Sequence, residues 1–271
     1  MKTGLFLPEQ PYDISPDDKA AYRDNGHILL RGVLSPEEAE ESRRYISRAA
    51  ARYNTETRKM EERDTYGKAF LQIMNLWRRD PDVAHYTLAT RFAGIAAGLM
   101  GVDRVRIYHD QALYKEPAGG PTPWHQDQYY WPVDTTDTVT MWMPLVPISE
   151  EMGMLTFASG SHRLGFMGNM AISDESEEIL GRLVHERGFP ITRATTMQAG
   201  DATFHAGWTL HAAPGNSSDQ LREVMTVIYV ADGARVTKPQ NTHQEADRQT
   251  WLLGLAPGEK IASELNPMVG R

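Results

Sequence analysis

The chain has 271 residues, of which 41% are hydrophobic and 24% charged, with no cysteine and a formal net charge of −8. These values are typical of a globular protein with a sizeable core. The negative charge argues against nucleic acid or an anionic membrane surface as a partner. The lack of cysteine excludes disulfides and thiolate metal ligands. No apolar run is long enough to span a membrane, and the stretch near the N-terminus is too short for a secretory signal, so we expect a cytoplasmic protein with no membrane partner.

The N-terminal part, to about residue 101, is expected to be mostly helical. Ser35 and Glu38 have the spacing of a capping box, and Pro36 occupies a first helical position. Together they predict a helix over residues 36–53. A second helix is predicted over residues 82–101, closed by Gly101.

From about residue 102 to 236 the pattern changes to short, alternating, β-branched and aromatic segments separated by Gly, Pro and Asn. These segments predict strands near residues 104–116, 138–148, 154–161, 201–213 and 221–231. One helix, over residues 174–188, interrupts the series. Helices followed by many short strands favour a mainly β fold, a sandwich or barrel with flanking helices. No repeat or linker marks a boundary, so we predict one domain over residues 1–271, with a C-terminal extension from about residue 237.

The segment PTPWHQDQYYWP, residues 121–132, carries the first candidate site. In a strand, residues two apart share a face, so His125 and Asp127 would point the same way. An imidazole and a carboxylate are two of the three ligands of a facial triad, which leaves half of the coordination sphere of Fe(II) open. The third ligand should be a histidine from another strand, and the candidates are His109, His162, His205 and His211.

His211 is the strongest of these candidates because of the segment that follows it. A polar turn leads into a strand in which Arg222 is the only positive charge of an apolar run. A buried arginine needs a carboxylate to accept its donors, and Glu223 would point to the opposite face. A bound dicarboxylate would meet this need.

The segment WHQD, followed by GDATFHAGWTLHAAPGNSSDQLREVMTVIYV, resembles the phytanoyl-CoA dioxygenase family of Fe(II)/2-oxoglutarate oxygenases. In that family the arginine follows the distal histidine by eleven residues, as Arg222 follows His211 here. The similarity extends to LYKEPAGGPTPWHQD and MWMPLVPISEEMGMLTFASGSHRLG, and so covers most of the chain. The resemblance implies a double-stranded β-helix (jelly-roll, cupin-like) core with N-terminal helices packed on one sheet.

The resemblance also implies roles for individual residues. His125, Asp127 and His211 would bind iron, and Arg222 would hold the distal carboxylate of 2-oxoglutarate. His205 remains a rival ligand, its alternative role being that of a core histidine that donates to the backbone.

Other positions are implied to lie around the co-substrate. Gln111 and Trp142 match family positions that contact 2-oxoglutarate or line its pocket. The family often has a serine two residues after the distal histidine, where this chain has Ala213. Arg222 would then carry more of the anchoring, or Thr140 or a water would substitute. Four further residues are candidates for contact with the substrate: Gln72, Asn75, Tyr129 and Trp131.

The activity implied is O2-dependent hydroxylation of an unactivated C–H bond in a small molecule, with release of succinate and CO2. The carboxylate of Asp127 argues against halogenation, which in related enzymes needs a small residue at that position. Desaturation, cyclisation or epimerisation with the same cofactors are alternatives, as are a non-catalytic cupin-like binding protein and a zinc hydrolase. The last would leave Arg222 unexplained.

Overall fold

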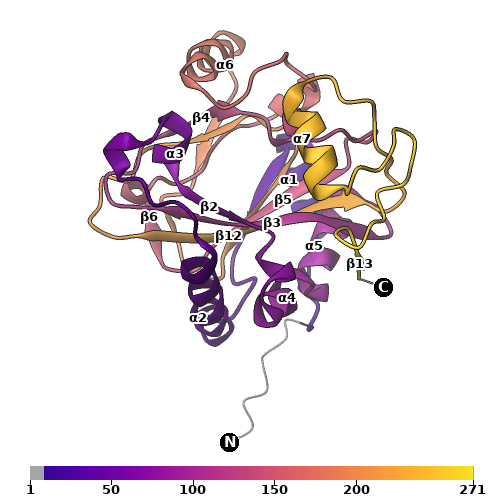
Figure 1. Ribbon diagram of the computed structural model, residues 1–271, viewed down its shortest axis with the longest axis horizontal. Coiled ribbons are helices and arrows are strands. Elements are labelled where there is room, and N and C mark those ends of the chain that lie inside the picture. The colour runs from indigo at the N-terminus through magenta and orange to yellow at the C-terminus, as the bar shows by residue number, and fades with distance from the viewer. Residues whose placement is uncertain (1–8, 271) are drawn as a thin grey trace, which may run out of the picture.

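The computed structural model describes residues 9–270 and shows curled antiparallel strands with helices outside them (Figure 1). The apolar N-terminal stretch that we expect not to be a secretory signal therefore lies outside the described residues. The helices are α1 (Pro16–Asn25), α2 (Pro36–Tyr53), α3 (Thr65–Ala69), α4 (Pro81–Thr87), α5 (Thr90–Met100), α6 (Asp174–Arg187) and α7 (Thr242–Trp251). No helix within the described residues is both long and apolar enough to cross a membrane.

The strands form one large antiparallel sheet, a smaller one facing it, and a short two-stranded ribbon. The large sheet has the order β1 (His27–Leu30), β10 (Ala202–Ala206), β5 (Thr138–Pro144), β12 (Arg222–Ala231), β3 (Val105–Lys115) and β13 (Met268–Val269), and β2 (Leu71–Met74) also pairs with β3. The smaller sheet has the order β4 (Thr122–His125), β11 (His211–Ala213), β7 (Thr156–Ala158) and β8 (Ile191–Arg193). The ribbon is β6 (Ile148–Ser149) with β9 (Thr196–Met197). This strand-rich fold with flanking helices confirms the predicted fold class.

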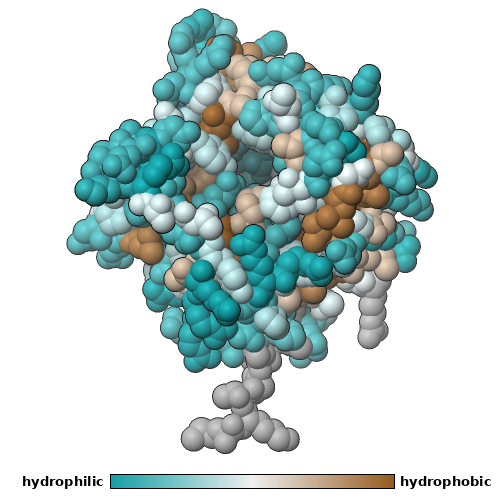
Figure 2. Space-filling view, viewed as in Figure 1, coloured by the Kyte–Doolittle hydropathy of each residue, from teal (hydrophilic) through white to brown (hydrophobic). Residues whose placement is uncertain are grey.

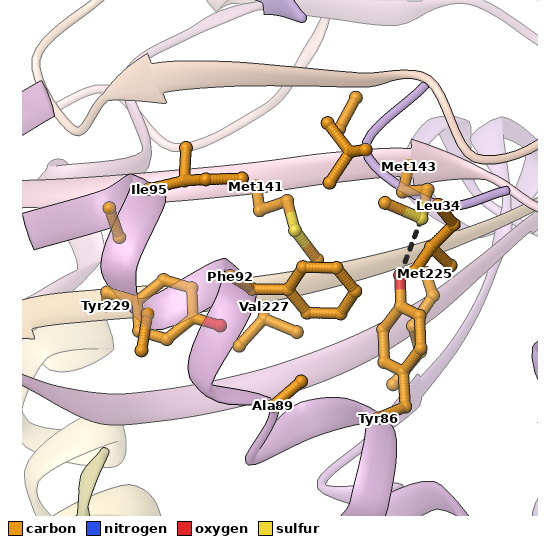
Figure 3. Close-up of a cluster of buried hydrophobic side chains, with 14 of the residues drawn as sticks. Leu34, Tyr86, Ala89, Phe92, Ile95, Met141, Met143, Met225, Val227 and Tyr229 are labelled. Atoms are coloured by element: carbon orange, nitrogen blue, oxygen red, sulfur yellow. Dashed lines mark hydrogen bonds between the residues drawn. The ribbon is translucent and has the colours of Figure 1, made fainter. Parts of the chain in front are cut away.

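Alternation along the central strands separates the main core from a hollow centre. On β5, Met141 and Met143 pack against the helices, whereas Thr140 and Trp142 face the centre. Figure 3 shows these methionines with Phe92 of α5 and other buried side chains, including the Tyr86 hydroxyl bonded to the Met143 sulfur at 3.2 Å. The sheet is thus fixed on one face by apolar burial and leaves its other face free for polar chemistry.

Several predicted boundaries are wrong. The strand predicted over residues 201–213 is β10 and β11, and the strand predicted over residues 138–148 is β5 and β6; the members of each pair lie in different sheets. The helix expected over residues 82–101 is two helices, because the chain turns at Leu88 and is extended at Ala89 before α5 begins. The turn lets α4 pack against α2 while α5 packs against α1 and the sheet. The predicted end at Gly101 is confirmed, since this residue has the left-handed φ of 73° that glycine tolerates.

A further error concerns the strand that carries the first motif. β4 ends at His125, and Asp127 starts the short 3₁₀ helix η3 (Asp127–Tyr130). Gln126 between them stays extended, with φ −122° and ψ 126°, and its amide donates away from the centre to the carbonyls of Gly165 and Trp208. His125 and Asp127 therefore still converge, although only the first lies in a strand.

Candidate metal and co-substrate site

Three predicted ligands meet in the centre of the fold. His125 ends β4 and His211 begins β11, and the two residues are cross-strand partners in the smaller sheet. Asp127 Oδ1 lies 3.6 Å from Nε2 of each histidine. The three ligand atoms fit within 4.8 Å of one another, which is a spacing that a metal ion can bridge.

The hydrogen bonds of the two histidines prepare them for a metal. His125 Nδ1 donates to the Pro123 carbonyl at 2.7 Å, and His211 Nδ1 donates to the Thr209 carbonyl at 2.9 Å. These bonds place the proton on Nδ1, so each Nε2 keeps a free lone pair directed at the cluster. Burial lowers the pKa of His211 far below its usual range, which keeps this imidazole neutral.

Asp127 is held by two further side chains. Its Oδ2 accepts hydrogen bonds from Thr140 Oγ1 at 2.8 Å and from His205 Nε2 at 3.1 Å. Burial alone would raise the pKa of Asp127, but neighbouring side chains, among them the donor His205, hold it well below its usual range. The carboxylate is therefore ionised, with Oδ1 left for a metal. His205 serves the carboxylate and not the backbone.

The other two candidate histidines lie outside this cluster. His109 lines the same cavity, and burial lowers its pKa to about 3. His162 lies in the short 3₁₀ helix η5 (Ser161–Leu164), where its Nε2 donates to the Arg23 carbonyl.

A cavity of about 300 Å³, named the central cavity from here on, opens beside the cluster. Figure 2 shows the hollow near the middle of this face, between α3 and α7 as labelled in Figure 1. Residues from both sheets line it, among them Gln111, Trp142, Thr122 and Arg222. It is the place for any molecule that binds next to the cluster.

Arg222 is the buried cation of this cavity. It is only 2% exposed, its Nη1 donates to the Gly153 carbonyl, and its guanidinium lies 5.3 Å from the Trp142 ring centre. Its Nε has no partner among the described residues, and burial lowers its pKa to about 9. Glu223 points away, as expected, and pairs with Arg43. A guanidinium with unused donors in a cavity is suited to an anion.

The structure brings some of the remaining predicted residues to the central cavity. Gln72 and Trp131 line it, and Gln72 Nε2 donates to Gln111 Oε1 at 2.7 Å. Asn75 and Tyr129 do not line it. Asn75 turns the chain with a left-handed φ of 49° and accepts from the Asp110 backbone, whereas the Tyr129 ring lies against Tyr130 and His243.

We did not predict the contacts that three side chains make near the site. His205 and Thr122 approach through cross-strand neighbours, which the sequence does not reveal. Asp247 comes from α7, a helix that we did not predict because its sequence THQEADRQTW is polar, with only Gln244 buried. Thr122 is the cross-strand partner of Ala213, where the family serine is missing.

Comparisons with known proteins agree with this geometry. The family model for phytanoyl-CoA dioxygenase (PhyH) matches residues 22–224. A probable alpha-ketoglutarate-dependent hypophosphite dioxygenase of Stutzerimonas stutzeri is 26% identical over 135 residues, which is 49% of this chain and about half (47%) of that relative. Phytanoyl-CoA dioxygenase domain-containing protein 1 of Danio rerio is 24% identical, over 86% of this chain and 96% of the relative.

Solved structures share the whole fold. The non-heme alpha-ketoglutarate-dependent carbocyclase SnoK from nogalamycin biosynthesis matches with a TM-score of 0.78 and 25% identity, over 98% of this chain and 99% of SnoK. EctD from S. alaskensis, solved with 2-oxoglutarate and 5-hydroxyectoine, matches with a TM-score of 0.71 and 21% identity, over 97% and 91% of the two chains. The family model spans most of the sequence, and this chain therefore belongs to the phytanoyl-CoA dioxygenase family of iron- and 2-oxoglutarate-dependent oxygenases.

Proposed function

We propose that the protein hydroxylates an unactivated C–H bond of a small molecule, using Fe(II), 2-oxoglutarate and O2 and releasing succinate and CO2. One observation carries the proposal: a two-histidine, one-carboxylate cluster and an arginine without a carboxylate partner face the same cavity. A zinc hydrolase would need the cluster but not the arginine.

His125, Asp127 and His211 would hold the ferrous ion. Two histidines and one carboxylate are the facial triad of non-heme iron oxygenases. The hydrogen bonds that these residues make to other groups keep each Nε2 unprotonated and hold the Asp127 carboxylate in place, as a metal requires. When bound, the iron and 2-oxoglutarate supply the oxidising chemistry: one atom of O2 enters succinate and the other enters the substrate. The protein contributes placement, charge and exclusion of water.

Arg222 would bind the distal carboxylate of 2-oxoglutarate in the central cavity. Its free Nε donor, its burial and the Trp142 ring beneath it favour a planar anion over water. Gln111 and Trp142 would form the sides of the same subsite, as the family pattern implies.

Thr122, on the strand next to Ala213, can replace the serine hydroxyl that the family often has at that position. Thr122 pairs with Ala213, lines the central cavity and accepts from Lys115 Nζ at 3.4 Å, so its own hydrogen is free for an anion. We therefore propose Thr122, and not Thr140, as the hydroxyl that helps Arg222, because Thr140 donates to Asp127.

Thr122→Val should weaken 2-oxoglutarate binding about tenfold, since it removes one hydrogen bond to a charged group. Calorimetric titration of the iron-loaded protein measures this change. Adding Ala213→Ser in the same chain should restore most of the affinity, because the new hydroxyl would lie on the adjacent strand. Unchanged binding by Thr122→Val would remove this residue from the subsite.

His205 and Thr140 should act on iron through Asp127. His205→Phe keeps an aromatic ring beside Phe157 but removes the donor to Asp127 Oδ2, and we expect ferrous ion to bind roughly 10- to 100-fold more weakly. The matched control is His109→Phe, since His109 lines the cavity without contacting a ligand. Equal iron affinity in the two variants would contradict the positioning role, and complete loss in His205→Phe alone would favour His205 as a ligand.

Other outcomes of the same oxidation form the second candidate function. SnoK is described as a carbocyclase and the similar structure SnoN as an epimerase, so this fold supports reactions besides hydroxylation. The mass of the product separates them. A gain of one oxygen atom supports hydroxylation, a loss of two hydrogens supports desaturation or ring closure, and an unchanged mass supports epimerisation.

A further inference from the structure

One carboxylate in the central cavity has no cationic partner. Asp247 of α7 lines the cavity and accepts a hydrogen bond from the Tyr108 hydroxyl at 3.1 Å. No ion pair joins Asp247 to any cation within residues 9–270, whereas its helix neighbour Glu245 pairs with Arg248 at 2.7 Å. A half-buried carboxylate with a single neutral donor lacks the compensation that such groups normally have.

The other charges of the site already balance one another. In the proposed complex the ferrous ion balances the 2-oxoglutarate dianion, and Asp127 balances Arg222. Lys115 lies behind Thr122, where burial and the nearby Arg222 lower its pKa to about 6, so it adds little charge at neutral pH. Asp247 is then the one carboxyl group without a countercharge among the described residues that line the cavity.

Aromatic side chains line the same cavity as this carboxylate. Tyr66, Tyr130, Trp131 and Trp251 all line the cavity, the last of them on the same helix as Asp247. Burial raises the pKa of Tyr66 and of Tyr130, and the charges of Asp127 and Asp247 add to both shifts. Tyr66 and Tyr130 line the same cavity as Asp127 and Asp247. Aromatic faces beside a carboxylate are suited to a cation.

We infer that the substrate of this oxygenase carries a protonated amine or quaternary ammonium group, which Asp247 binds while the aromatic wall holds the adjoining apolar body. This inference rests on the proposed function and names the chemical class of its substrate. Burial raises the pKa of Asp247 to about 7, so a bound cation would also restore its ionised form. The amine would be held at α7, away from Arg222, and would direct the remainder of the molecule toward the metal cluster.

A matched pair of probes tests the inference without knowledge of the substrate. Phenethylamine and 2-phenylethanol have similar size and differ in charge. Calorimetric titration into the protein loaded with Fe(II) and 2-oxoglutarate, without oxygen, should show the amine binding at least about tenfold more tightly than the alcohol. Equal affinities, tighter binding of the alcohol, or no detectable binding of the amine at millimolar concentration would overturn the inference.

Variants on one helix locate the effect. Asp247→Asn should reduce the amine-to-alcohol ratio to about one with little change for the alcohol, whereas Glu245→Gln, which removes an exposed charge from α7, should keep the preference. A preference for the amine that survives Asp247→Asn would overturn the assignment of Asp247. Tyr108→Phe keeps the carboxylate and should therefore keep the preference for the amine. The titration of 2-oxoglutarate in the same samples is independent of these results: its failure would reject the proposed function, whereas intact 2-oxoglutarate binding without an amine preference would reject only the substrate class.

Discussion

Replacing Asp127 with alanine should reduce the rate of succinate formation at least about 1000-fold, even at saturating ferrous ion. The variant loses one of three ligands and leaves two neutral imidazoles with no negative charge between them. It also frees the donors of Thr140 and His205, which now meet no acceptor in a buried site. Assay of succinate with excess Fe(II), 2-oxoglutarate and O2 measures the change.

The control for Asp127→Ala is Thr140→Val, which removes a hydrogen bond to the same carboxylate but no ligand. We expect Thr140→Val to keep most of the rate at saturating iron and to lose iron affinity. Undiminished turnover of iron-loaded Asp127→Ala would remove the facial triad from the proposal. It would also make His205 a candidate metal ligand again, since its Nε2 lies 3.1 Å from the Asp127 carboxylate.

Replacing Arg222 with alanine should raise the 2-oxoglutarate concentration needed for half-maximal activity at least about 100-fold. Loss of a charge-assisted contact to a buried carboxylate costs about 3 kcal/mol or more, which corresponds to this factor. The 2-oxoglutarate requirement of Arg222→Lys should lie between those of the unchanged protein and Arg222→Ala. Lysine keeps the charge but lacks the planar set of donors that stacks on Trp142. An unchanged requirement in Arg222→Ala would place the anchor elsewhere.

Stability gives a second measurement for Arg222. In the protein without ligand, this guanidinium is buried without a carboxylate and leaves Nε unpaired, so its burial opposes folding. Arg222→Met keeps much of the volume and should leave the thermal midpoint unchanged or raise it, although 2-oxoglutarate binding is lost. Such a residue is retained for binding and not for stability. Marked destabilisation by Arg222→Met would instead assign Arg222 a structural role.

The sequence predicts the elements whose pattern is local. The capping box at Ser35 and the proline at Pro36 define the start of α2, and runs of β-branched and other apolar residues predict β5 and β12. Spacing along the chain is also enough to select His125 and Asp127, and the family resemblance implies His211 as the third ligand. Strand pairing then brings them together, since His125 and His211 are partners across β4 and β11.

What the sequence could not predict depends on neighbours across the fold. The partnership of His205 with Asp127 requires the register of β10 beside β5, and the nearness of Thr122 to Arg222 requires both sheets. The break at Ala89 has no glycine or proline to mark it. Packing decides it, because α4 and α5 have different partners.

Helix α7 lies in a part of the chain that follows the metal-binding residues and Arg222. The match to the family model ends at residue 224, after the metal cluster and Arg222, whereas Asp247 and Trp251 come from the segment beyond it. The residues of the metal cluster and the cavity-lining Asp247 and Trp251 therefore come from successive stretches of the chain. If Asp247 binds the substrate as proposed, exchange of residues 237–271 between relatives should change the substrate scope and keep His125, Asp127, His211 and Arg222 in place.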